Sequence, residues 1–178
     1  MSLGHLFPDG NDAALPLNPE EHRADNGSVD ETWVLIDQNT GLHVAWYFWL
    51  RVLDEVNRSQ RYGEPFGLLL LRADAPSGRA ARALEEAAAH VPAIVRGTDL
   101  AGTLGPGRVG ILLTHQDEPS AARARDRIFD ELGRRDARAA SWEGWLLTYP
   151  QDAAAISTLL TAGWDGSPLA APAVGQSA

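Results

Sequence analysis

An uninterrupted apolar run in the middle of the chain constrains the fold more than any other feature. Residues 66–71 read Phe-Gly-Leu-Leu-Leu-Leu. This is the length of a strand, and it lacks the polar and apolar alternation of a strand with one wet face. The turn-forming residues 62–65, Tyr-Gly-Glu-Pro, precede it. The run therefore predicts a central strand covered on both faces.

The segments around this strand predict an α/β sandwich. Apolar residues three or four apart predict helices over residues 44–61, 78–95, 118–135 and 153–162. Pro92 should disturb the end of the second of these helices. Short apolar segments predict strands over residues 100–104, 109–114 and 139–149. The first two of these strands flank Gly105–Arg108, a composition that turns a chain sharply. The order of elements is that of a sandwich with a central hairpin.

One domain is expected between two tails. Residues 1–30 are rich in Pro, Gly, Asn, Asp and Glu without apolar periodicity, which predicts a flexible leader. Residues 166–178 are mostly Gly, Pro, Ser and Ala, which predicts a disordered tail. A single folded domain over residues 31–165 is the expectation, because that length suits one core.

Composition excludes several kinds of chemistry. The chain has no cysteine, so disulfides and thiolate metal sites are impossible. Its 15 basic residues, all arginine, face 24 acidic ones, and a net charge of -9 argues against nucleic acid as a partner. The five histidines show no metal-ligand spacing, so no metal and no cofactor are expected. Neither a bilayer-spanning run nor a secretion signal is visible, which predicts a cytoplasmic location without membrane contact.

Two strings that flank the first predicted helix resemble the GGDEF domain of diguanylate cyclases. Residues 37–42, Asp-Gln-Asn-Thr-Gly-Leu, match all but one named position of the family's Asp-x-Leu-Thr-Gly-Leu turn. Residues 61–66 are similar to its Arg-Tyr-Gly-x-Pro-Leu join. The resemblance covers residues 37–163. It implies an α+β sandwich with a mostly antiparallel central sheet, a signature β-hairpin and flanking helices.

The signature hairpin departs from the family's Gly-Gly-Asp/Glu-Glu-Phe. In its place the chain carries Gly105, Pro106, Gly107, Arg108 and Val109. The family's third position helps to hold magnesium, and Gly107 has no side-chain oxygen. Where the family has a metal-binding Asp-x-Asp, this chain has Arg72-Ala73-Asp74. An arginine cannot ligate a cation.

Two further parts of the cyclase apparatus are missing. Residues 75–78 lead almost directly into a helix and leave no room for the family's guanine-recognition string. Val44 and Ala45 replace its Asn-Arg pair. Since phosphoryl transfer depends on positioning and on metal ions, we expect an inactive interaction module without catalytic residues. The alternatives are residual GTP cyclase activity, with Asp74 and Asp99 as the only nearby acids, or an unrelated α/β interaction domain.

One ligand motif of the family has a counterpart here. Arg96-Gly97-Thr98-Asp99 ends five residues before Gly105, where many members bind their product, cyclic di-GMP, through Arg-x-x-Asp. Arg127 matches a further arginine on the following helix. The resemblance therefore implies a cyclic di-GMP site of Arg96, Asp99 and Arg127, since arginine can grip phosphate or guanine. Alternatively, Asp99 caps local backbone groups. The motif recurs at residues 51–54, 123–126 and 127–130, where helical spacing explains it.

Four consecutive aromatic residues, Trp46, Tyr47, Phe48 and Trp49, begin the first predicted helix. Consecutive helical residues point in different directions, so they cannot all face one core. Some of this surface should be covered, either by the N-terminal segment with Trp33 or by a protein partner or second copy. A protein partner or a homodimer is the corresponding expectation.

Overall fold

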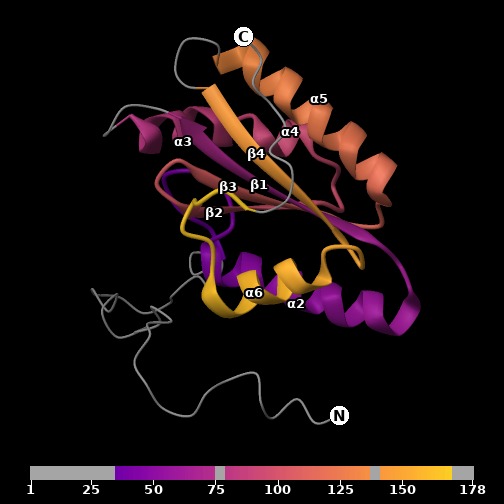
Figure 1. Cartoon of the computed structure of the whole chain (residues 1–178). Helices are drawn as coiled ribbons and strands as arrows, with labels where there is room; N and C mark the ends of the chain where they lie inside the picture. Colours follow the sequence, from indigo (N-terminus) through magenta and orange to yellow (C-terminus); the bar gives the residue numbers. More distant parts are fainter. Residues whose placement is uncertain (1–34, 75–78, 137–140, 170–178) are drawn as a thin grey trace, which may run out of the picture.

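A four-stranded antiparallel sheet forms the middle layer of the protein (Figure 1). The computed structural model describes residues 35–74, 79–136 and 141–169. The strands are β1 (Phe66–Asp74), β2 (Leu100–Gly105), β3 (Arg108–Leu113) and β4 (Ser141–Tyr149). Their order is β2-β3-β1-β4, and each neighbouring pair is antiparallel. The predicted α+β sandwich with a mostly antiparallel sheet and a central hairpin is confirmed.

Helices cover both faces of this sheet (Figure 1). The helices are α2 (Ala45–Tyr62), α3 (Ala80–Ala88), α4 (Val91–Ile94), α5 (Glu118–Asp136) and α6 (Ala153–Ala162). One core lies between the sheet and the layer of α3, α4 and α5, and the other lies between the sheet and the layer of α2 and α6. No helix in the described ranges is long and apolar enough to cross a membrane.

Strand β1 lies between β3 and β4, as the apolar run predicts. Every residue from Phe66 to Leu71 is buried. Leu69 and Leu71 point into the core of α3, α4 and α5, while Leu68 and Leu70 point into the core of α2 and α6. Because alternate side chains of a strand point to opposite faces, a strand covered on both sides has no polar positions.

The segment predicted as a helix over residues 78–95, with its end disturbed by Pro92, forms two helices. The structure divides it into α3, which ends at Ala88, and α4, which begins at Val91. Pro92 explains the break, because proline lacks a backbone N–H and its ring clashes with the carbonyl four residues earlier, that of Ala88. The proline instead occupies the first turn of α4, where an N–H is not needed.

Helix α2 approaches the hairpin closely through Phe48. Gly102 of β2 and Gly110 of β3 are cross-strand partners. A Cβ atom added to Gly102 would lie 2.6 Å from Phe48 Cβ, and one added to Gly110 would lie 2.5 Å from Phe48 Cε1. Only glycine leaves room for this fully buried ring. The sequence thus fixes where α2 rests on the hairpin.

The four consecutive aromatics divide between core and surface. Phe48 is fully buried, and Trp49 packs partly against the same core. Trp46 and Tyr47 are half-buried and form an edge-to-face pair with ring centroids 5.8 Å apart. Trp33, one of the residues expected to cover them, lies outside the described residues.

The packed chain extends beyond α6. Gly166 is buried, and Leu169 packs partly against the core of α2 and α6. Residues 166–169 are therefore part of the fold, past the boundary at residue 165 that composition predicts. The expected leader, residues 1–30, and the rest of the expected tail, residues 170–178, lie outside the described residues.

Candidate functional site

The hairpin that replaces the signature motif is tied to the end of β1. Gly105 and Gly107 have φ values of 118° and 67°, which side-chain-bearing residues rarely adopt. The backbone N–H of Ala73 on β1 donates to the carbonyl oxygen of Gly107 over 2.8 Å. A Cβ at Gly107 would lie 2.7 Å from Ala80 Cβ, so the turn also touches the start of α3. The tip is therefore held on two sides.

Three charged residues form a row across the sheet beside this hairpin. Arg72 on β1 is the cross-strand partner of Arg108 on β3 and of Glu143 on β4. Arg72 forms an ion pair with Glu143. Its guanidinium carbon also lies 5.4 Å from the ring centroid of Trp145. All of these side chains lie on the face of the sheet that α2 and α6 cover.

The segment after α6, which we call the C-terminal strap (residues 164–169), lies against these arginines. Arg108 Nη1 donates to the carbonyl oxygen of Trp164 over 2.9 Å. Arg72 Nη1 donates to the carbonyl oxygen of Gly166 over 2.6 Å. Both arginines near the hairpin therefore donate hydrogen bonds to backbone carbonyl oxygens of the protein itself.

Acidic side chains do not gather at this end of β1. Among the described residues, no three His, Asp or Glu side chains lie close enough together to hold a metal ion. Asp74, the only acid of the Arg72-Ala73-Asp74 string, is exposed and accepts a hydrogen bond from Ser141 over 3.4 Å. Residues 75–78, where the guanine-recognition string was expected to be missing, lie outside the described residues. Val44 and Ala45, at the start of α2, offer no polar side chain.

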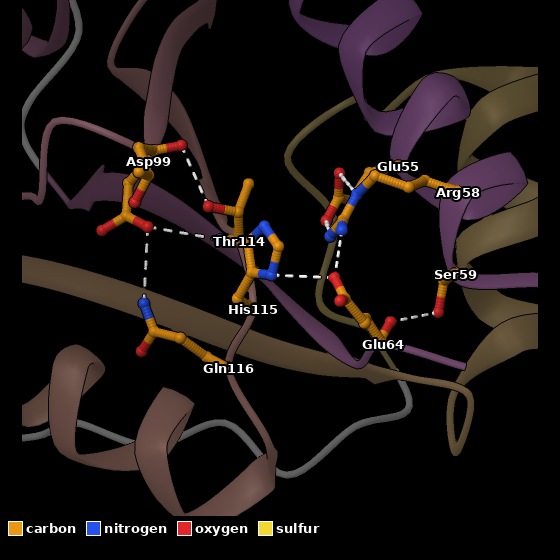
Figure 2. Close-up of polar contacts among 9 residues, drawn as sticks. Glu55, Arg58, Ser59, Glu64, Asp99, Thr114, His115 and Gln116 are labelled. Atoms are coloured by element: carbon orange, nitrogen blue, oxygen red, sulfur yellow. Dashed lines mark hydrogen bonds and ion pairs between the residues drawn. The ribbon is translucent and has the colours of Figure 1, made fainter. Parts of the chain in front are cut away.

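The Arg-x-x-Asp turn lies at the other end of the hairpin, just before β2 (Figure 2). The backbone N–H of Arg96 donates to Asp99 Oδ2 over 3.0 Å, and the N–H of Asp99 donates to the carbonyl of Arg96 over 3.0 Å. Asp99 Oδ1 accepts from the backbone N–H of Thr114 over 3.2 Å and from the Gln116 amide over 3.4 Å. Both carboxylate oxygens of Asp99 therefore fix local structure, as the capping alternative supposed.

The two arginines of the expected cyclic di-GMP site are both exposed. Arg96 follows α4, and Arg127 lies on α5. Among the described residues, no ion pair joins either guanidinium to Asp99. The copy of the motif on α2 behaves as its helical spacing predicts: Arg51 Nη1 lies 3.1 Å from Asp54 Oδ2 on an exposed face.

A polar network that sequence reasoning missed links this turn to α2 (Figure 2). Arg58 on α2 forms ion pairs with Glu55 and with Glu64, which precedes β1. Glu64 Oε2 also lies 2.8 Å from His115 Nδ1. His115 is the residue after Thr114, whose backbone N–H donates to Asp99. The Arg58–Glu55 spacing of three on a helix was a visible signal. The Glu64–His115 contact was not, because it joins residues far apart in the sequence.

The ion pairs of this network shift the pKa values of Glu64 and Arg58. The hydrogen bond from Arg58, together with the nearby charge of His115, lowers the pKa of the Glu64 carboxyl below its usual value. Hydrogen bonds to Glu55 and Glu64 raise the pKa of Arg58. His115 adopts a φ of 54°, a left-handed conformation uncommon outside glycine. The network therefore fixes the chain at the start of β1 and after β3.

Solved structures with a similar fold are GGDEF domains. The chain is similar to the diguanylate cyclase SiaD from Pseudomonas aeruginosa, solved in complex with its activator SiaC, with 23% identity and a TM-score of 0.54. The match covers 71% of this chain and 56% of that one. This chain therefore spans little more than half the length of SiaD.

Two structures from Caulobacter crescentus show the same likeness. The coiled coil and GGDEF domain of DgcB, in complex with c-di-GMP, matches at 14% identity and a TM-score of 0.57, over 64% of this chain and 69% of that one. A sensory box/GGDEF family protein matches at 19% identity and a TM-score of 0.57, over 71% and 95%. No family model and no curated protein matches the sequence. The chain has the fold of GGDEF domains.

Proposed function

We propose that this chain is a catalytically inactive domain with the GGDEF fold that works as a protein-interaction module. The observation that carries the proposal is the pair of arginines, Arg72 and Arg108, at the hairpin end of the sheet. Each donates a hydrogen bond to a backbone carbonyl of the chain itself. Arg72 lies where the resemblance implies a metal-binding aspartate, and Arg108 follows Gly107, which replaces the family's acidic third position.

Two fixed positive charges oppose the chemistry of a cyclase. Magnesium prefers oxygen ligands in near-octahedral geometry, and it neutralises the charge that develops on a transferring phosphoryl group. Arg72 supplies donors and no acceptor, and Gly107 supplies no side chain at all. With Asp74 exposed and bonded to Ser141, the described residues at this site offer no set of acceptors for a metal.

Protein interaction is supported by the surface of α2. Trp46 and Tyr47 are half-buried, and Leu50 retains 44% of its surface exposed. Large aromatics are enriched at interfaces because they bury much area with little loss of conformational freedom. SiaD, a structure of the same fold, was solved with an activator protein. A protein partner or a second copy of this chain is accordingly part of the proposal.

Chromatography with light scattering tests the homodimer on the whole chain. If α2 mediates self-association, the wild-type mass rises toward that of a dimer with concentration, and Leu50→Asp keeps the protein monomeric. Asp54→Ala, an exposed change on the same helix, is the matched control and should associate like the wild type. A monomeric mass at every concentration removes the homodimer and leaves a different protein as the partner.

Binding of cyclic di-GMP is a second candidate function. It is favoured by Arg96, whose exposed guanidinium lies on a turn that Asp99 holds in place. DgcB, which has the same fold, was solved with c-di-GMP. In this chain Arg96 and Arg127 would supply the phosphate and guanine contacts. Asp99 would position the turn, because its carboxylate oxygens accept hydrogen bonds from the backbone N–H groups of Arg96 and Thr114.

Calorimetric titration of cyclic di-GMP decides this candidate. A receptor gives saturable heat with the wild type and loses it in Arg96→Ala. Arg51→Ala is the matched control, since Arg51 belongs to a copy of the same motif on a helix, and this variant should bind as the wild type does. Absence of heat in the wild type eliminates the receptor function and leaves the interaction module.

A further inference from the structure

The C-terminal strap packs against the core of α2 and α6, and side chains of the sheet hold its backbone as they would hold a bound peptide. It is neither helix nor strand. Its carbonyls at Trp164 and Gly166, two residues apart, accept from Arg108 and Arg72, which are neighbours across two strands. Two alternate residues of the strap are thus held by two arginines that face each other on adjacent strands. Main-chain contacts of this kind hold a peptide without reading its side chains.

Two positions of the strap are also recognised by shape. Trp164 is buried, and its ring lies edge-to-face against Trp145, with centroids 5.5 Å apart. Its indole N–H donates to the carbonyl of Ser167 over 2.9 Å, which folds the strap around the ring. Gly166 has a φ of 91°, and a Cβ there would lie 3.0 Å from Arg108 Cδ. An aromatic residue and a glycine two positions later are therefore required.

The residue between them is acidic and lies next to a cation. Asp165 is exposed and accepts a hydrogen bond from the backbone N–H of Ser167 over 2.8 Å. That hydrogen bond lowers the pKa of Asp165, and the charge of Arg108 adds to the effect. Arg108 therefore lies close enough to Asp165 to favour an acidic residue at this point of a bound segment.

The strap can leave without disrupting the sheet. Gly163, which joins it to α6, has a φ of 72° and open space around it. The two arginine contacts come from side chains, so no strand pairing breaks when the strap moves. Its departure uncovers the core surface under Trp164 and Leu169, so an occupant that replaces the strap must cover that surface again. A segment outside the sheet can still open locally at a lower free energy than the whole fold.

We propose that Arg72, Arg108 and Trp145 form a groove for a short peptide with the pattern aromatic-acidic-glycine, and that the strap is its resident occupant. A partner protein carrying such a segment binds by displacing the strap. This inference rests on the proposed interaction function and names the class of partner. In the absence of the partner, the strap shields Trp145 and the two arginines.

The groove is tested with a fluorescein-labelled peptide of residues 163–169, Gly-Trp-Asp-Gly-Ser-Pro-Leu, and the full chain. In Gly166→Val the added side chain prevents the strap from packing beside Arg108, which leaves the groove open. This variant should therefore bind the labelled peptide, measured as a rise in fluorescence anisotropy. Wild type should bind at least about tenfold more weakly, because a tethered segment competes at an effective concentration near millimolar. Adding Arg108→Ala to Gly166→Val should abolish binding, and a peptide with alanine in place of tryptophan should not bind.

The proposal is overturned if Gly166→Val unfolds cooperatively but does not bind the labelled peptide. It is also overturned if the double variant with Arg108→Ala binds the peptide as tightly as Gly166→Val alone. If Gly166→Val does not fold, hydrogen exchange in the wild type decides. The indole N–H of Trp164 should have a protection factor, its intrinsic exchange rate divided by the observed one, at least tenfold smaller than that of the backbone amide of Leu69 in β1. Equal protection factors would mean that the strap opens only with the whole fold, which contradicts the proposal. These results are independent of GTP turnover, which tests the inactivity claim alone.

Discussion

Arg72 and Arg108 lie directly opposite each other on β1 and β3, on the same face of the sheet. Like charges in such a pair repel and destabilise a sheet. Here the repulsion is offset by Glu143, which pairs with Arg72, and by two backbone carbonyls of the C-terminal strap. The arrangement binds main-chain oxygen and repels cations, which is the reverse of what a metal-dependent cyclase requires.

Loss of Glu143 should therefore destabilise the fold. Glu143→Ala removes the carboxylate that pairs with Arg72 opposite Arg108, and we expect a decrease of about 1 kcal/mol in the free energy of unfolding, measured with urea. Glu86→Ala is the control, because Glu86 pairs with Arg82 on an exposed helix surface. That variant should unfold at nearly the wild-type urea concentration. An equal effect of the two changes would contradict the special role of Glu143.

The contact of Phe48 with the paired glycines gives a second prediction. Gly110→Ala places a methyl group 2.5 Å from the Phe48 ring. We expect destabilisation by about 1–3 kcal/mol, since overpacking forces side chains and backbone to shift. Gly97→Ala is the control, because nothing lies within 4 Å of a Cβ there. Thermal melts of the two variants should separate clearly, and coincident melting temperatures would show that α2 is not held by this contact.

Asp99 and Arg96 should differ in their effect on stability. Asp99→Ala removes the acceptor for the backbone N–H groups of Arg96 and Thr114, so we expect a loss of about 1–3 kcal/mol in denaturant unfolding. Arg96→Ala removes only an exposed side chain and should change stability by less than about 0.5 kcal/mol. If Asp99→Ala is as stable as Arg96→Ala, the carboxylate is not a structural cap.

Glu64 should make stability depend on pH on the acid side. Its pKa in the folded protein is lowered by Arg58, so its contribution is fully present above its unfolded value of about 4.3 and is lost as the pH falls through the folded pKa. The unfolding midpoint of the wild type should fall more steeply below about pH 4.3 than that of Glu64→Gln. Glu85→Gln, at an exposed site on α3, should follow the wild type. Parallel curves for all three proteins would refute the assignment.

Much of the fold can be predicted from local patterns. The apolar run of residues 66–71 locates the central strand, and the composition of residues 105–108 locates the hairpin turn. Pro92 already signals a helix end, yet the alanine-rich segment before it suggests a single helix because helix propensity is nearly uniform there. The structure shows where the break lies, between Ala88 and Val91.

The C-terminal strap and the Glu64 network could not be predicted in this way. Residues 166–169 have the composition of a tail, and the contacts that hold the strap join positions 94 and 56 residues apart in the sequence. Asp99 lies between these cases: its capping role could be stated as an alternative from the sequence, whereas its acceptance of a hydrogen bond from Thr114, 15 residues away, could not. Long-range pairing is invisible to composition and periodicity.

The inactivity of the domain is tested most directly by incubating the full chain with GTP. The assay measures formation of cyclic di-GMP and pyrophosphate at high protein concentration, with Mg²⁺ and separately with Mn²⁺. Because Arg72 and Gly107 leave no metal ligands, we predict no product above the buffer level. Product that rises with protein concentration and disappears in Asp74→Asn would contradict the account.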